Sequence, residues 1–126
     1  MTTSEVIFDF EKLEAYREAD AAVSLVLKGF GKWPARYRWL ENQLGRAALS
    51  IPSNIAEGNG REGVRDKIQF FRIARGSLNE CVTGLEAASH LGLVSAETRS
   101  EIRSRLHRVV MLLGGLVRSL RRGAVS

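Results

Sequence analysis

Residues 43–61 read QLGRAALSIPSNIAEGNGR, and this stretch decides the fold. Placed on a helix, the apolar residues in it and just before it recur at spacings of three and four, so they form one stripe that faces a core. The stripe consists of Leu40, Leu44, Ala47, Ile51 and Ile55. Between Trp39 and Ala56 the only charged residues are Glu41 and Arg46. So little charge is typical of a helix that is covered on more than one side, by its own bundle or by another copy of the chain.

A polar stripe lies about a quarter turn away, because successive helical residues are about 100° apart. It consists of Gln43, Arg46, Ser50, Asn54 and Glu57. Farther along the chain, Arg75 projects in nearly the direction of two core candidates of its own helix, Ile68 and Val82. An unpaired buried arginine is costly, so we predict that Arg75 pairs with Glu57.

We interpret these six polar residues as a structural hydrogen-bonded network that holds the second helix against the third or against a second subunit. An active site is the alternative reading of the same residues. It is disfavoured because the stripe contains no histidine, cysteine or lysine that would titrate or attack near neutral pH.

Proline and glycine residues predict the shape and the end of this helix. Pro52 removes one backbone donor, so we predict a kink near residues 48–51 rather than a break. Gly58 and Gly60 are predicted to end the helix in the left-handed conformation that glycine tolerates.

The rest of the chain repeats the helical pattern. We predict helices over residues 9–28, 35–57 and 63–91, and a fourth that Ser95 caps. The fourth has the cleanest apolar stripe, which consists of Ile102, Leu106, Val109, Leu113, Leu116 and Leu120. Short loops favour antiparallel neighbours. The predicted fold is therefore all-α: an antiparallel up-down-up-down four-helix bundle over residues 9–122, with a flexible arm at 1–8 and a tail at 123–126.

Composition limits the function classes. A chain of 126 residues is one ordinary domain, and its single cysteine allows no internal disulfide, so we expect a reducing cytoplasmic location. The acidic start of the sequence lacks a basic segment followed by an apolar run, so we expect no signal peptide, and no apolar run approaches the roughly 18 residues of a membrane helix. Cys81, His90 and His107 do not form a metal-ligand set or a nucleophile–base pair. We therefore expect no catalytic residue, metal, cofactor or small-molecule substrate.

The charge is unevenly distributed. Residues 1–20 hold six acids and two bases, whereas residues 21–126 hold seventeen bases and eight acids, and fifteen of all nineteen bases are arginine. The fourth helix carries a basic face, which consists of Arg103, Arg108, Arg118, Arg121 and Arg122. Arginine binds phosphate well, so this face is a candidate nucleic-acid-binding surface. Codon bias and solubility are competing explanations for a basic composition.

Two segments carry a family resemblance. SIPSNIAEGNGR at 50–61, preceded by Gln43 and Leu44, and IARGSL at 73–78, followed by Glu80, resemble the four-helix-bundle proteins encoded in intervening sequences of 23S ribosomal RNA. The resemblance covers residues from Phe10 to about Leu120. It implies up-down bundles that assemble as rings of five. A related group, the accessory variability determinants of diversity-generating retroelements, is thought to bind nucleic acid and a reverse transcriptase.

We expect a non-enzymatic homo-oligomer, a pentamer by resemblance, that binds RNA or another acidic partner through its basic surface. The alternative is a structural or protein–protein adaptor that binds no nucleic acid.

Overall fold

The computed structural model describes residues 4–125, with the backbone alone for 124 and 125. In this part of the chain there are four α-helices and no strand. They are α1 (Glu14–Lys28), α2 (Arg38–Gly60), α3 (Val64–His90) and α4 (Ala96–Val125). Two short 3₁₀ helices, η1 (Asp9–Lys12) and η2 (Ala35–Tyr37), precede α1 and α2. The predicted all-helical class and the number of helices are confirmed.

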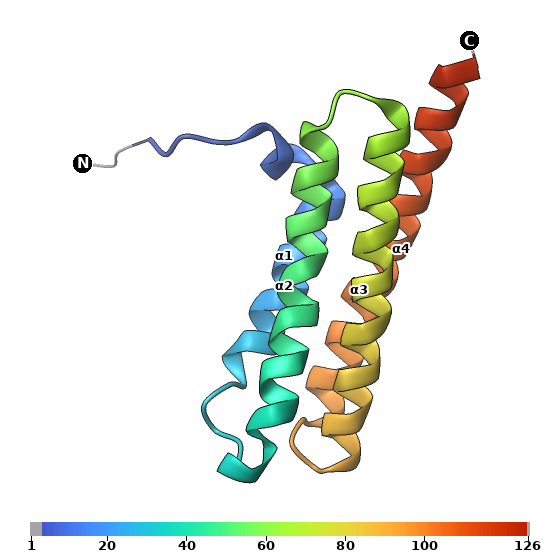
Figure 1. The fold of residues 1–126 in the computed structure, drawn as a ribbon. Coiled ribbons are helices and arrows are strands. Elements are labelled where there is room, and N and C mark those ends of the chain that lie inside the picture. The colour runs from blue at the N-terminus through green and yellow to red at the C-terminus, as the bar shows by residue number, and fades with distance from the viewer. Residues whose placement is uncertain (1–3, 126) are drawn as a thin grey trace.

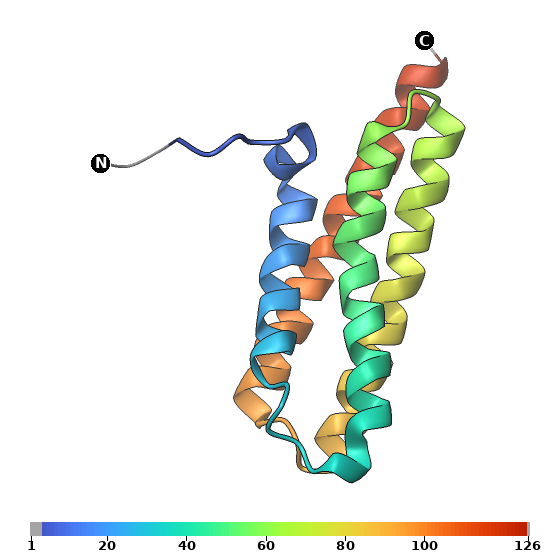
Figure 2. The same ribbon diagram turned by 60° about the vertical axis from the view of Figure 1, so that its left-hand side comes forward.

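The four helices lie side by side. The α1–α2 and α3–α4 connections are at one end of the molecule, and the α2–α3 turn is at the other (Figures 1 and 2). The most extensive contact joins α2 with α3, and within the described chain no close backbone contact joins α1 with α3 or α2 with α4. Each helix therefore packs against two neighbours around a single core.

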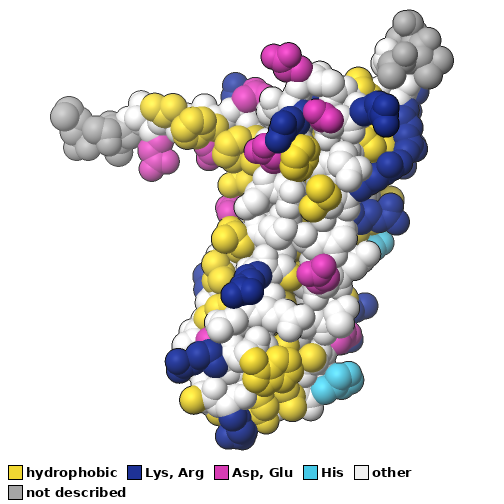
Figure 3. All heavy atoms as spheres, viewed as in Figure 1, with side chains coloured by type: hydrophobic (Ala, Val, Ile, Leu, Met, Phe, Trp, Pro, Cys, Tyr) yellow, Lys and Arg dark blue, Asp and Glu magenta, His cyan; other side chains and the backbone are white. Residues whose placement is uncertain are grey.

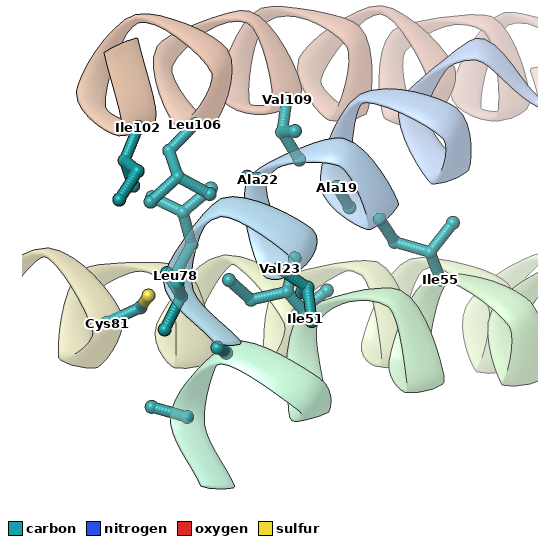
Figure 4. Packing of buried hydrophobic residues seen from close by; sticks show 14 of the residues in the cluster. Ala19, Ala22, Val23, Ile51, Ile55, Leu78, Cys81, Ile102, Leu106 and Val109 are labelled. Carbon is teal, nitrogen blue, oxygen red and sulfur yellow. The ribbon is translucent and has the colours of Figure 1, made fainter. Parts of the chain in front are cut away.

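The core is built from one stripe of each helix, and Figure 4 shows these side chains converging. Its largest fully buried members include Ile51 and Ile55 of α2, and Ile102 and Leu106 of α4. The α1 stripe is lined with alanines, which let the neighbouring helices approach closely. They are Ala15, Ala19 and Ala22. In the predicted α4 stripe the first four residues are buried, while Leu116 and Leu120 are half-buried at the end of α4 that extends beyond the bundle (Figure 1).

Helix boundaries follow the sequence closely, with differences at the ends. Ser95 caps α4 as predicted, because its Oγ accepts a hydrogen bond of 3.1 Å from the backbone N–H of Thr98. The residues from Asp9 form η1, and α1 itself begins only after Leu13, whose backbone is extended. Helix α4 continues to Val125, past the boundary predicted at residue 122. Residues 1–3 of the predicted arm and residue 126 of the predicted tail lie outside the described residues.

The prediction for Gly58 and Gly60 is wrong. Helix α2 is continuous through Pro52 and both glycines, and it ends because Arg61 is extended. Among the described residues, positive φ occurs only at Gly31 and Gly92, which lie in the other two connections. Gly58 serves close packing instead: a Cβ there would lie 2.8 Å from Cε1 of Phe71 on α3. None of the described helices has the length and apolar character that a membrane span requires.

Candidate nucleic-acid interface

Part of the predicted polar network exists, and it joins α2 to α3. The Oγ atoms of Ser50 and Ser77 share a hydrogen bond of 2.7 Å. The side-chain amide of Asn54 donates to the carbonyl oxygen of Ser50 at 2.8 Å and to its Oγ at 2.9 Å. Ser77 is the one buried polar residue among those described. This network holds two helices together and offers no group suited to catalysis near neutral pH.

The predicted pair of Glu57 and Arg75 is wrong, as is the predicted burial of Arg75. Both side chains are exposed, and Oε1 of Glu57 lies 2.7 Å from Nη2 of Arg61, one turn farther along the chain. The reason is the orientation of α3. Ala74 and Ser77 face the neighbouring helices, so the buried stripe is rotated away from Arg75. Gln43 and Arg46 are also exposed and lie outside the hydrogen-bonded network.

The five arginines predicted to bind nucleic acid fall into two groups. The first group, Arg103 and Arg108, is tied to carboxylates of other helices. Nη1 of Arg103 lies 3.0 Å from Oε1 of Glu86 on α3. Nε of Arg108 lies 3.2 Å from Oε1 of Glu18 on α1, and Arg108 also pairs with Glu14. These arginines therefore neutralise acids on neighbouring helices.

The pairing around Glu86 is reinforced by a second arginine. Nε of Arg99 lies 2.6 Å from Oε2 of Glu86, so two arginines of α4 share one carboxylate of α3. The hydrogen bond from Arg99 lowers the pKa of Glu86, and the positive charges of Arg99 and Arg103 add to the effect. In this half of α4 most of the arginines are paired with carboxylates of the same chain.

The second group contributes to a groove between α3 and α4. Arg118 and Arg121 of α4 face Arg72 and Arg75 of α3 across a hollow of about 250 Å³. Its remaining lining is apolar or glycine, and consists of Phe71, Leu113, Gly114 and Val117. We call the four arginines and this hollow the arginine groove. Arg122 is exposed next to it and does not line it.

No carboxylate lines the arginine groove, and in the described part of the chain none of its four arginines forms an ion pair. The sequence explains why: there is no acid from residue 67 to 79 or from 102 to 125. All four side chains are exposed, so their guanidinium groups are available to a ligand. Figure 3 shows the Lys and Arg side chains gathered along the edge of the molecule formed by the C-terminal half of α4.

The spacing of the arginines and the lack of a side chain at Gly114 shape the groove. Each helix supplies two arginines three residues apart, which places both on one face. The side chain of Arg118 lies back over the preceding turn, where a Cβ on Gly114 would be 3.3 Å from its Nη1. Gly114 thus leaves room for that guanidinium close to the helix surface. The planar, multidentate guanidinium group matches the oxygen atoms of a phosphate.

Sequence reasoning missed Arg72 and Arg75 as members of a basic site. A signal was present, because both lie in an acid-free stretch of α3 and share a face at a spacing of three. What the sequence could not supply was the proximity of that face to the end of α4.

The structure also describes the single cysteine and the possible metal-ligating side chains. Cys81 is 1% exposed in the core, and burial raises the pKa of its thiol to about 12, so the reactive thiolate is not formed near neutral pH. Within the same residues, no three histidine, cysteine, aspartate or glutamate side chains lie close enough to hold a metal ion.

Comparison with known proteins bears on both the fold and the family. A solved structure from Bacteroides thetaiotaomicron, described as a protein with unknown function from the S23 ribosomal protein family, superposes with a TM-score of 0.70 at 21% identity. The match covers 82% of this chain and 97% of that one, so it supports the fold. None of the curated protein sequences matches the chain.

The family model for the 23S rRNA-intervening sequence protein matches residues 11–115. This range includes both conspicuous segments, 50–61 and 73–78, all of α1, α2 and α3, and α4 as far as residue 115. It also includes Arg72 and Arg75, whereas Arg118 and Arg121 lie beyond it. The resemblance inferred from those segments is confirmed: the chain belongs to the 23S rRNA-intervening sequence protein family.

Proposed function

We propose that this protein is a non-enzymatic, antiparallel up-down-up-down bundle that assembles with copies of itself and binds RNA through the arginine groove. The observation that carries the proposal is the groove's composition: four exposed arginines from two helices and no carboxylate. Elsewhere on α4, Arg99, Arg103 and Arg108 are already paired with acids.

The groove favours recognition of the phosphate backbone rather than of base sequence. Its one aromatic residue, Phe71, is buried, so no ring is available there to stack on a base. Binding through phosphate contacts depends steeply on salt, since each neutralised phosphate releases counterions.

Self-assembly would bring several copies of the arginine groove, one from each chain, into one particle. The outer face of α2 and α3 carries few charged side chains in Figure 3, while Trp39 and Leu49 of α2 and Ile73 of α3 are exposed. These features support coverage by another copy, and the family resemblance adds a ring of five as the expected assembly. Phosphate contacts repeated around such a ring would strengthen binding of one RNA strand.

The test compares two double variants that remove equal charge. Arg118→Gln with Arg121→Gln empties one wall of the groove, and Arg103→Gln with Arg108→Gln removes two carboxylate-paired arginines. Binding of a labelled single-stranded RNA is followed by fluorescence anisotropy over a range of salt concentrations. We expect the groove variant to lose at least about tenfold in affinity, with a salt slope lower by roughly two per chain. The control should retain most of its affinity.

Two outcomes would contradict the proposal. Equal losses in both variants would mean that net charge, and not the groove, determines binding. An absence of any RNA binding at micromolar protein and low salt would favour the alternative function, a protein–protein adaptor. Thermal melts of both variants establish that the comparison is made between folded proteins.

A further inference from the structure

The N-terminal arm carries an unusual apolar segment. Val6, Ile7 and Phe8 are consecutive, and their side chains are 82%, 65% and 60% exposed. Isolated exposed hydrophobic residues are common on proteins, but three in a row on an extended segment are not accounted for by the fold of a single chain. Figures 1 and 2 both show this segment leading away from the bundle, and Figure 3 shows its hydrophobic side chains continuing to the base of the arm.

The base of the arm is held in place, which sets its outward direction. The backbone N–H of Phe8 donates a hydrogen bond of 2.9 Å to Oε1 of Glu11. Oδ2 of Asp9 accepts one of 3.0 Å from the side-chain amide of Asn59 at the end of α2. The ring of Phe8 stacks on that of Phe10, with centroids 6.0 Å apart. These contacts fix the chain at Phe8 and Asp9, where the arm leaves the bundle.

A groove suited to such a segment lies between α1 and α2. It has a volume of about 210 Å³, and its walls are mostly apolar. The lining consists of Phe10, Tyr16, Asp20, Val23, Leu49, Pro52, Ser53 and Ala56. A cavity of about 150 Å³ holds a benzene molecule, so this groove has room for one large side chain. Leu49 at its rim is 59% exposed, although it lies in the most weakly charged helix of the chain.

We infer that the segment Val6–Phe8 of one copy docks in the α1–α2 groove of a second copy. The side chains of the arm are apolar and exposed, the groove is lined mostly by apolar side chains, and the fixed base holds the arm away from its own bundle. The arm and the groove are different surfaces, so either two copies exchange arms in a closed pair or each copy passes its arm to the next in a head-to-tail contact. Such contacts generate closed rings when the rotation closes and filaments when it does not.

This inference rests on the self-assembly part of the proposed function and names the surface that produces it. It is independent of RNA binding, because the arginine groove lies between α3 and α4 and shares no residue with the α1–α2 groove.

The experiment measures molar mass by sedimentation over a range of protein concentrations. The arm variant replaces Val6, Ile7 and Phe8 with serine, and the groove variant is Leu49→Glu. Met111→Ser is the matched control, since Met111 is equally exposed on α4 and lies outside the α1–α2 groove. We expect the wild type and the control to be oligomers and both test variants to have the mass of one chain. All substituted side chains are exposed, so circular dichroism should show unchanged helix content.

A crosslinking measurement tests the contact directly. Chains with Ile7→Cys are mixed with chains with Leu49→Cys and oxidised mildly, and Cys81 contributes no background because it is buried. We expect a disulfide between the two kinds of chain, and none when Met111→Cys replaces Leu49→Cys.

Each contrary outcome has a separate meaning. If the wild type is an oligomer and either test variant keeps its mass, arm exchange is wrong and self-assembly stands. If the wild type is a single chain at all concentrations, arm exchange and self-assembly both fail. RNA binding would then be judged only by the arginine-groove variants.

Discussion

Replacing Gly58 with alanine tests the close contact between α2 and α3. In most helices this substitution stabilises, because glycine costs about 0.5–1 kcal/mol relative to alanine at an interior helix position. Here the new Cβ would lie 2.8 Å from Cε1 of Phe71, 3.0 Å from its Cδ1 and 3.1 Å from Cβ of Phe70. The Phe71 ring is 4% exposed and has little freedom to move, and Cβ of Phe70 is held by the backbone of α3.

The change in the free energy of unfolding that Gly58→Ala causes is the difference between two opposing effects. Overpacking a well-packed contact costs about 1–3 kcal/mol. Subtracting the helix-propensity gain leaves a net loss of roughly 0.5–2 kcal/mol in the free energy of unfolding. In a domain of this size 1 kcal/mol moves Tm by roughly 3–5 °C. We therefore expect Gly58→Ala to lower Tm by about 2–10 °C.

Gly76→Ala is the matched control. Gly76 is exposed within α3, and a Cβ there would meet no atom within 4 Å. The propensity gain is then unopposed, so Tm should rise by about 2–4 °C. Both variants are melted at one protein concentration by circular dichroism, because the proposed self-assembly would make Tm depend on concentration. A Gly58→Ala protein as stable as Gly76→Ala would refute the argument from close packing.

Further variants test individual contacts. Ser77→Ala removes the buried hydroxyl that pairs with Ser50, and urea unfolding should show a loss of about 1 kcal/mol; an unchanged midpoint would mean that the hydrogen bond adds nothing. Glu57→Ala breaks only an exposed pair, so the loss should stay below about 0.5 kcal/mol, and a larger loss would reveal a buried partner. The pKa of Glu86 is lowered in the folded protein. The stability that ionised Glu86 contributes should therefore be complete above pH 4.5, the ordinary pKa of a glutamate, and should disappear as the pH falls through the lower pKa of the folded state. The Tm difference between wild type and Glu86→Gln should therefore narrow below pH 4.5, and a constant difference would contradict this. Cys81 should react with an alkylating reagent only after unfolding, as mass spectrometry would show.

Much of the fold was predictable because helix formation depends on patterns among residues close together in the sequence. The stripe from Ile102 to Leu113 and the cap at Ser95 each depend on residues within a few turns of one another. The start and end of α3 were predicted within a residue, since glycine and loop residues bound it. The family, too, was readable from two short segments around residues 50–61 and 73–78.

The candidate site was less predictable, because whether an arginine is neutralised depends on the acids that other helices bring next to it. Arg103 and Arg118 look alike in the sequence, yet the first is neutralised by Glu86, seventeen residues away on another helix, and the second is not. The misplacement of Arg75 has a related cause. A buried stripe that uses small residues such as Ala74 and Ser77 has a weak apolar signal, so its direction around the helix is easily misjudged by one residue.

The sequence by itself determined that this chain forms four helices, where α3 begins and ends, where α4 begins, and which residues form most of the α4 core stripe. Only the tertiary structure decided which arginines remain free, that Arg72 and Arg75 join Arg118 and Arg121 in one groove, and that Gly58 serves packing rather than helix termination. The physical reason is the distance along the chain between the residues that determine each property. Helix formation and apolar periodicity are properties of neighbouring residues, whereas ion pairing and close packing depend on which helix faces are brought together.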